Sequence, residues 1–117
     1  MLASILSLFL LTSTSVLQDH PPAKEELIGS TLNVDILSNP LVDETGHKYG
    51  NGFSAENHNP YGMKITIQMT SGSNVKDQLK RGAVTIQPHQ TVQLGEIVQN
   101  DMTLDWHWYV EWYVEPQ

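Results

Sequence analysis

The sequence predicts an all-β fold, an antiparallel immunoglobulin-like β-sandwich of about six or seven strands. From residue 31 onward, apolar and polar residues alternate with a period of two, whereas a helix would give a period near 3.6. Turn residues interrupt this alternation at intervals of about 8–12 residues, the spacing expected of a sandwich or barrel. No long segment has a helical period, so the chain is expected to bury one core between two sheets.

The N-terminal segment is expected to direct export. An apolar run from Leu2 to Leu11 is followed by small polar residues, and Ser13 and Ser15 suit the two small positions before a cleavage site. The run is too short to span a bilayer comfortably as a helix. No Lys or Arg precedes it, so an uncleaved anchor is the alternative. The expected organisation is a signal peptide over 1–17, a polar tether over 18–30 and a β-sandwich domain over 31–117.

Composition narrows the classes of protein to consider. The formal net charge is −7 and the six basic residues are scattered, so no basic stripe is available to bind nucleic acid. The chain has no cysteine, which excludes disulfides and an acylated lipoprotein cysteine. It also has no Asn-x-Ser/Thr acceptor for N-glycosylation. Together these features favour a bacterial envelope protein, periplasmic or extracellular, with no membrane span after cleavage.

The first three predicted strands follow directly from the alternation. One begins at Thr31 and is expected to end at Asn39 and Pro40, because proline interrupts a ladder of hydrogen bonds. A weaker strand is expected over 49–57, where glycines lower the strand propensity. The clearest strand covers 63–69, where one face is apolar and the other polar, as in an antiparallel sheet with one wet side.

The second half of the domain alternates less regularly. Residues 75–81 are expected to be irregular, with Leu79 reaching into the core. Short strands are expected over 84–87 and 92–97. Within the second of these, Gly95 breaks the parity of the apolar residues, which indicates a β-bulge.

The last segment, 103–115, is predicted to be one long strand with aromatic residues on both faces. One face carries Trp106, Trp108, Val110, Trp112 and Val114, and the other carries His107, Tyr109, Glu111, Tyr113 and Glu115. If the tryptophans fill the core, the tyrosine face is exposed, where it stabilises neighbouring strands or forms an aromatic platform for a ligand. The sequence leaves open which face is buried. The candidate binding residues are therefore Tyr109, Tyr113, His107, Trp108 and Trp112.

Several motifs occur in a recognisable order. Phe53 to Asn57 (Phe-Ser-Ala-Glu-Asn) precedes a proline and an alternating strand, Val92 to Ile97 follows Pro88, and a Trp-x-Trp-Tyr-x-x-Trp-Tyr run closes the chain. Over residues 49–116 the chain resembles the β-sandwich accessory domain that precedes the peptidase domain in some exported zinc metallopeptidases of the LytM/lysostaphin type. The His-x-x-x-Asp and His-x-His motifs that hold zinc in the peptidase are absent. The resemblance therefore implies a non-catalytic module.

Catalytic and metal motifs are also missing from the sequence. There is no cysteine nucleophile, no Gly-x-Ser-x-Gly elbow, no glycine-rich phosphate loop and no His-Glu-x-x-His, so we expect neither an enzyme nor a cofactor. Three of His47, His58, His89 and His107 could meet at one end of a sandwich. We interpret them instead as solvated residues in or near turns, and expect no metal site. Beside His58, the residues Asn57, Asn59 and Pro60 are typical of a turn, so a turn already accounts for this segment.

The leading functional hypothesis is an exported, non-catalytic interaction module that binds a protein partner, such as a cell-wall enzyme, through loops or the face of Tyr109 and Tyr113. The alternative is a domain that binds carbohydrate or cell-wall glycan by stacking aromatic rings on sugars. A small metal-assisted hydrolase is the third and least supported hypothesis. The last strand could also accept a strand from another chain at an open edge.

Overall fold

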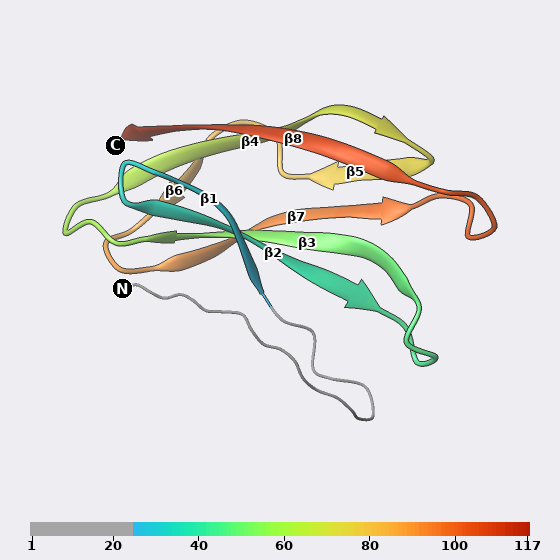
Figure 1. The fold of residues 1–117 in the computed structure, drawn as a ribbon. Helices are drawn as coiled ribbons and strands as arrows, with labels where there is room; N and C mark the ends of the chain where they lie inside the picture. The colour runs from blue at the N-terminus through green and yellow to red at the C-terminus, as the bar shows by residue number, and fades with distance from the viewer. Residues whose placement is uncertain (1–24) are drawn as a thin grey trace.

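A computed structural model describes residues 25–117, which form eight strands without a helix (Figure 1). The predicted signal peptide and most of the predicted tether lie outside the described residues. The strands are β1 (Glu26–Thr31), β2 (Val34–Val42), β3 (Lys48–Asn57), β4 (Met63–Ser73), β5 (Val75–Leu79), β6 (Val84–Ile86), β7 (Thr91–Gln99) and β8 (His107–Pro116). Within this part of the chain, no helix is long and apolar enough to cross a membrane.

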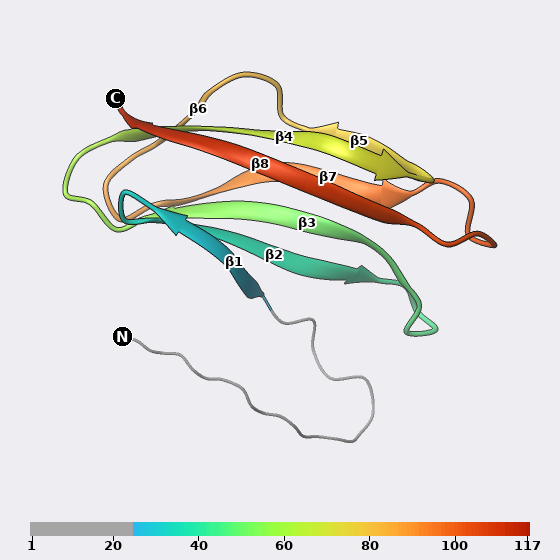
Figure 2. The same cartoon turned by 45° about the horizontal axis from the view of Figure 1, so that its top comes forward.

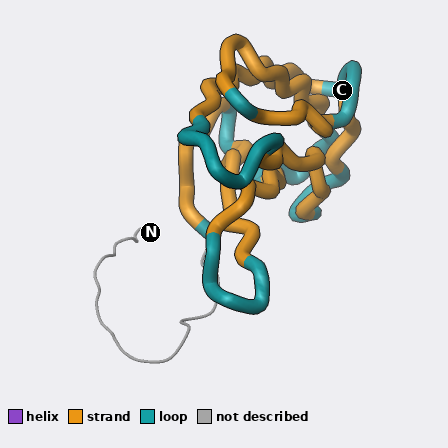
Figure 3. Tube along the Cα trace, turned by 90° about the vertical axis from the view of Figure 1, so that its right-hand side faces the viewer, coloured by secondary structure: helices purple, strands orange, loops and turns teal. Residues whose placement is uncertain are grey.

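The strands form two antiparallel sheets that lie one above the other (Figure 2). The larger sheet has the order β1-β2-β3-β7-β5 and the smaller has the order β6-β4-β8. In a view roughly along the strands, the Cα trace shows the strand segments connected by loops at the ends of the sandwich (Figure 3). The all-β, two-sheet prediction is confirmed, with eight strands rather than six or seven.

The core lies between the two sheets, and every strand except β1 contributes a buried apolar side chain to it. Its members are Val34, Ile36, Phe53, Ala55, Met63, Ile65, Ile67, Leu79, Ile86, Leu94, Ile97 and Val114. In β2, β3 and β4 the buried apolar positions are two residues apart, so the alternation seen in the sequence sorts side chains as predicted there. Leu79 does reach the core, with 4% of its surface exposed.

Several predicted boundaries are wrong. β1 begins at Glu26, inside the segment expected to be a tether. β2 runs through Pro40 to Val42, and within residues 25–117 the pairing of β1 with β2 extends only to Ser38, so the missing N–H of Pro40 interrupts no bond to β1 there. The segment expected to be irregular forms β5, which pairs with β7. The last strand begins at His107 rather than at residue 103.

The predicted bulge at Gly95 is confirmed. Phe53 lies opposite Gly95 and Ser54 opposite Gln93, so Leu94 is the extra residue on β7. Gly95 has a φ of 107°, and a Cβ there would lie 2.5 Å from the carbonyl oxygen of Gln78 on β5. Glycine is thus required both by the backbone conformation and by the close approach of β5.

Asn74 joins the β4–β5 corner to the loop that leads into β8. Its side-chain amide donates to the carbonyl oxygens of Asp101 (2.8 Å), Leu104 (3.1 Å) and Asp105 (3.3 Å), and its Oδ1 accepts from the Asp101 N–H. The Asp101 carboxylate in turn accepts from the N–H and hydroxyl of Thr103, and these bonds hold the pKa of Asp101 below its usual value. Asn74 therefore positions the loop that leads into the start of β8.

Asn74→Ala is expected to lower the free energy of unfolding by about 2–3 kcal/mol, because it removes these hydrogen bonds and leaves at a φ of 59° a residue that tolerates the left-handed conformation less well than asparagine. Asn74→Gly keeps the backbone conformation accessible and loses only the hydrogen bonds, so its cost should be smaller by about 1 kcal/mol. Urea unfolding followed by circular dichroism measures both. Equal stability of the alanine variant and the wild type would show that the corner does not depend on Asn74.

Candidate binding face

β8 is an edge strand that pairs only with β4 among the described residues, and its two sides have different surroundings. On the inner side, the Trp108 ring packs edge-on against Phe53, with centroids 5.1 Å apart and planes at 84°. The Trp108 Nε1 donates to Asn51 Oδ1 at 3.2 Å. This tryptophan therefore links the small sheet to β3 of the large sheet, with its polar atom satisfied.

Trp112 makes the equivalent link to β1. Its Nε1 donates to the hydroxyl of Thr31 at 3.1 Å, and its ring covers Gly29 so closely that a Cβ at Gly29 would overlap it. Both tryptophans named as candidate binding residues are thus half-buried structural residues of the inner side. Trp106 precedes the strand, and its ring lies 5.6 Å from the ammonium of Lys48.

The outer side of β8 is exposed. Tyr109 and Tyr113 keep 63% and 64% of their surfaces accessible, and the positions are about 14 Å apart along the strand. Between them, the Glu111 carboxylate accepts from the Gln68 amide of β4 at 2.6 Å. Thr66 lies opposite Tyr113. We call these five residues the tyrosine face.

The tyrosine face includes a shallow open groove of about 300 Å³ next to Tyr113. Its lining comes from Thr66, Gln68, Glu111, Trp112 and Tyr113. His107 is exposed beside this face, with its ring centroid 6.0 Å from that of Tyr109 in an edge-on arrangement. The structure therefore brings Tyr109, Tyr113 and His107 together on one side. The rings of Trp108 and Trp112 contact the other sheet, and of these two residues Trp112 alone also borders the groove.

No family model, curated protein or solved structure matches the chain. The resemblance to a LytM-type accessory domain therefore stays a prediction from the sequence. The surfaces of the molecule have to be interpreted from their own chemistry.

The histidines do not converge at one end of the sandwich. His47 precedes β3 and His58 follows it, so the two lie at opposite ends of a strand about 30 Å long. The His47 Nε2 contacts Gln99 Oε1 at 3.1 Å, and His89 lies in an exposed turn with a φ of 59°. Only His58 has acidic neighbours of the kind that bind metals, among residues 25–117.

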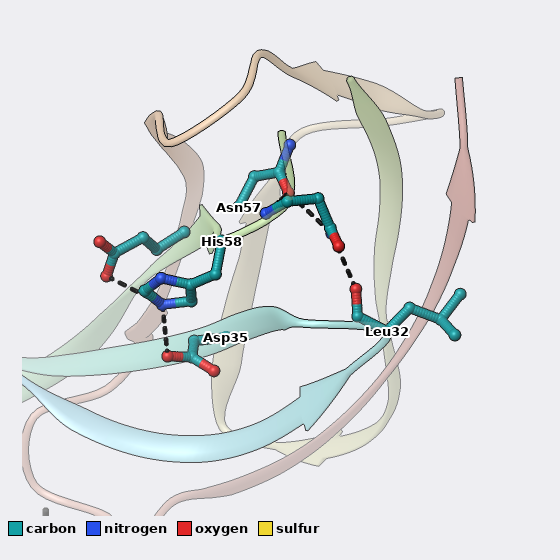
Figure 4. A network of polar contacts seen from close by, with 6 residues as sticks. Leu32, Asp35, Asn57 and His58 are labelled. Atoms are coloured by element: carbon teal, nitrogen blue, oxygen red, sulfur yellow. Dashed lines mark hydrogen bonds and ion pairs between the residues drawn. The ribbon is translucent and has the colours of Figure 1, made fainter. Parts of the chain in front are cut away.

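His58 lies between two carboxylates on the outer side of the large sheet (Figure 4). Its Nε2 is 2.9 Å from Asp35 Oδ2 and 3.7 Å from Glu56 Oε1. Asp35 on β2 and Glu56 on β3 are directly opposite in the antiparallel register. The sequence reading missed this group because Asp35 and Glu56 are 21 positions apart, and only the register of two strands makes them neighbours.

A buried amide network holds the turn that carries His58. The Asn57 amide donates to the carbonyl oxygens of Tyr61 (2.9 Å), Ile86 (3.0 Å) and Gln87 (3.2 Å). Its Oδ1 accepts from the backbone N–H and the side-chain amide of Asn59, both at 2.9 Å. The Asn59 amide also donates to the Leu32 carbonyl, which ties this turn to the β1–β2 turn (Figure 4).

Proposed function

We propose that this chain is an exported, non-catalytic interaction module of the cell envelope that binds a protein partner with the tyrosine face. The observation that carries the proposal is the exposure of two tyrosines, about two-thirds accessible each, on a regular strand of a rigid sandwich. Aromatic side chains bury a large area on binding and lose little conformational entropy, which is why tyrosine is enriched at protein interfaces.

Charge indicates the kind of partner. Glu111 lies between the tyrosines, and the whole chain carries a net charge of −7. A partner that presents Arg or Lys would place the cation on a tyrosine ring and pair it with the Glu111 carboxylate. We therefore propose a basic protein surface as the ligand. The immunoglobulin-like strand arrangement expected from the sequence is part of the same proposal, because such domains commonly serve as binding scaffolds.

The export part of the proposal rests on the apolar segment over 2–11 and the small residues after it. N-terminal sequencing of the protein recovered from the envelope or medium tests it. A mature chain that starts at Met1 would contradict cleavage.

The tyrosine face is tested with the double variant Tyr109→Ala/Tyr113→Ala. Wild-type protein is immobilised, envelope proteins retained by it are identified, and the affinity of each is measured for both forms. If each tyrosine is a binding hot spot worth about 2 kcal/mol, each substitution should weaken binding about thirtyfold. The fold should not change, because both rings are largely exposed.

The matched control is Tyr61→Ala, which removes another exposed tyrosine outside the tyrosine face, with 54% of its surface accessible. It should bind as tightly as the wild type. A partner that binds the double variant and the wild type equally well would contradict the proposed surface. So would the absence of any partner that prefers the wild type to the double variant.

A second function is favoured by one observation, the Gln68–Glu111 pair beside the Tyr113 ring in the shallow groove. An aromatic ring next to amide and carboxylate groups is able to stack on a sugar and bond its hydroxyls. Peptidoglycan fragments added to the wild type and to the double variant distinguish the two functions. Saturable binding to the wild type alone would favour glycan over protein as the ligand.

A further inference from the structure

We propose that Asp35, Glu56 and His58 form a binding site for a divalent transition-metal ion such as Zn²⁺. The site is independent of the tyrosine face, since it lies on the outer side of the other sheet. One imidazole and two carboxylates supply nitrogen and oxygen donors of the types that zinc takes.

The donor atoms are already close to the spacing that a metal requires. One donor atom from each residue lies within 4.8 Å of the other two. Tetrahedral ligands at about 2.0–2.1 Å from zinc are about 3.3 Å apart. The distances from the His58 Nε2 to the Asp35 and Glu56 oxygens, 2.9 and 3.7 Å, bracket that value. Small side-chain rotations would therefore bring all three donors to one ion.

The three residues are held on rigid structure. Asp35 and Glu56 sit on paired strands of the large sheet, and their register places them side by side. The backbone of His58 is held in place by its N–H, which donates to the Asn33 carbonyl oxygen at 2.9 Å, and by the buried Asn57 that precedes it. A metal would thus meet a preformed arrangement and would not have to order a loop, which favours binding.

Charge at the site also favours a cation. Like charges directly opposite on neighbouring strands destabilise a sheet. Among the described residues, neither carboxylate has an ion pair with Lys or Arg, and His58 is the only partner of both. A divalent ion would neutralise the two carboxylates together, while keeping the imidazole neutral as a ligand.

Solvent exposure limits the choice of metal and the expected affinity. The side chains of His58, Asp35 and Glu56 are 47%, 29% and 40% exposed, so one or more water molecules would complete the coordination. Hard ions such as Mg²⁺ prefer oxygen ligands and keep their hydration shell. We therefore expect Zn²⁺ to bind more tightly than Mg²⁺ by at least about a hundredfold.

The test is calorimetric titration of Zn²⁺ at neutral pH into the full chain, purified without a polyhistidine tag. The expected result for the wild type is one ion per chain. Asp35→Asn and His58→Gln should each weaken binding at least about tenfold. Two controls, His89→Gln in an exposed turn and His20→Gln in the N-terminal segment, should bind zinc as the wild type does. Circular dichroism checks that each variant is folded.

A second readout locates the ion. In a histidine-ring NMR spectrum, Zn²⁺ should shift the resonances of His58 and leave those of His89 and His107 in place. No saturable heat with the wild type would overturn the proposal. It would also be overturned if His20→Gln abolished binding, or if the ligand variants bound zinc as tightly as the wild type. Tyr109→Ala/Tyr113→Ala should leave zinc binding unchanged, so failure of one proposal is distinguishable from failure of the other.

Discussion

Asn57→Asp is expected to cost about 3–5 kcal/mol of unfolding free energy at pH 8, a large share of the total for a domain of this size. Asn57 is fully buried, and its amide donates to three carbonyl oxygens. A carboxylate of the same shape would present an oxygen to those carbonyls and leave them without a donor. It would also bury a charge with no cation beside it.

The loss in free energy of unfolding caused by Asn57→Asp should depend on pH, and its direction follows from the pKa of the new carboxyl. Burial raises the folded-state pKa of an introduced carboxyl above its unfolded value of about 3.9. A carboxyl whose pKa is raised in the folded state favours the folded protein while it is protonated, at low pH. That contribution is lost as the pH rises through the folded-state pKa. The stability difference between variant and wild type should therefore be smaller at pH 4 than at pH 8. Urea unfolding at both values measures it.

Asn100→Asp is the matched control for this measurement, because Asn100 is exposed. It should change the free energy of unfolding by less than about 0.5 kcal/mol at either pH. If Asn57→Asp were as stable as Asn100→Asp, the amide network would not be what holds the β3–β4 turn in place.

Phe53→Ala is the second substitution with a large expected effect, about 3–5 kcal/mol. Phe53 is fully buried in β3, and its ring packs against Trp108 of β8. Truncation would leave a cavity between the two sheets at the contact that joins them. The cost should appear in urea unfolding, and the tryptophan emission of the folded protein should move to longer wavelength as water reaches the Trp108 ring.

Two further substitutions calibrate this result. Phe53→Leu fills most of the volume and should cost less than half as much as Phe53→Ala. Tyr61→Ala removes an exposed ring and should stay within about 0.5 kcal/mol of the wild type. An alanine variant that unfolds at the same urea concentration as Tyr61→Ala would mean that the two sheets do not depend on the Phe53–Trp108 contact.

The alternation of apolar and polar residues along single strands was enough to predict several features correctly. Alternation over 63–69 identified the inward side of β4, and the break in parity at Gly95 identified the bulge in β7. On the last strand, alternation separated Tyr109 and Tyr113 from Trp108 and Trp112, and the structure places the tyrosines outside. These features depend on neighbours along one strand, and side chains two residues apart must share a face.

Features that depend on a partner strand were predicted less well. β5 was expected to be irregular, yet its pairing with β7 makes it a strand. Pro40 was expected to end a strand, yet it lies within β2, beyond the last position that pairs with β1 in the part of the chain that the structure describes. Pairing supplies hydrogen bonds that no local propensity reports.

The sequence by itself determined the class of fold, the inward and outward faces of its clearest strands and the separation of the tyrosines from the tryptophans on the last strand. It left open which of those two faces is exposed, and the structure decided that it is the tyrosine side. The tertiary structure decided which strands are neighbours, and with it the meeting of Asp35, Glu56 and His58. A period of two tells which side of a sheet a residue faces. The register between strands, which brings distant carboxylates to one point, depends on hydrogen bonding and core packing across the whole domain.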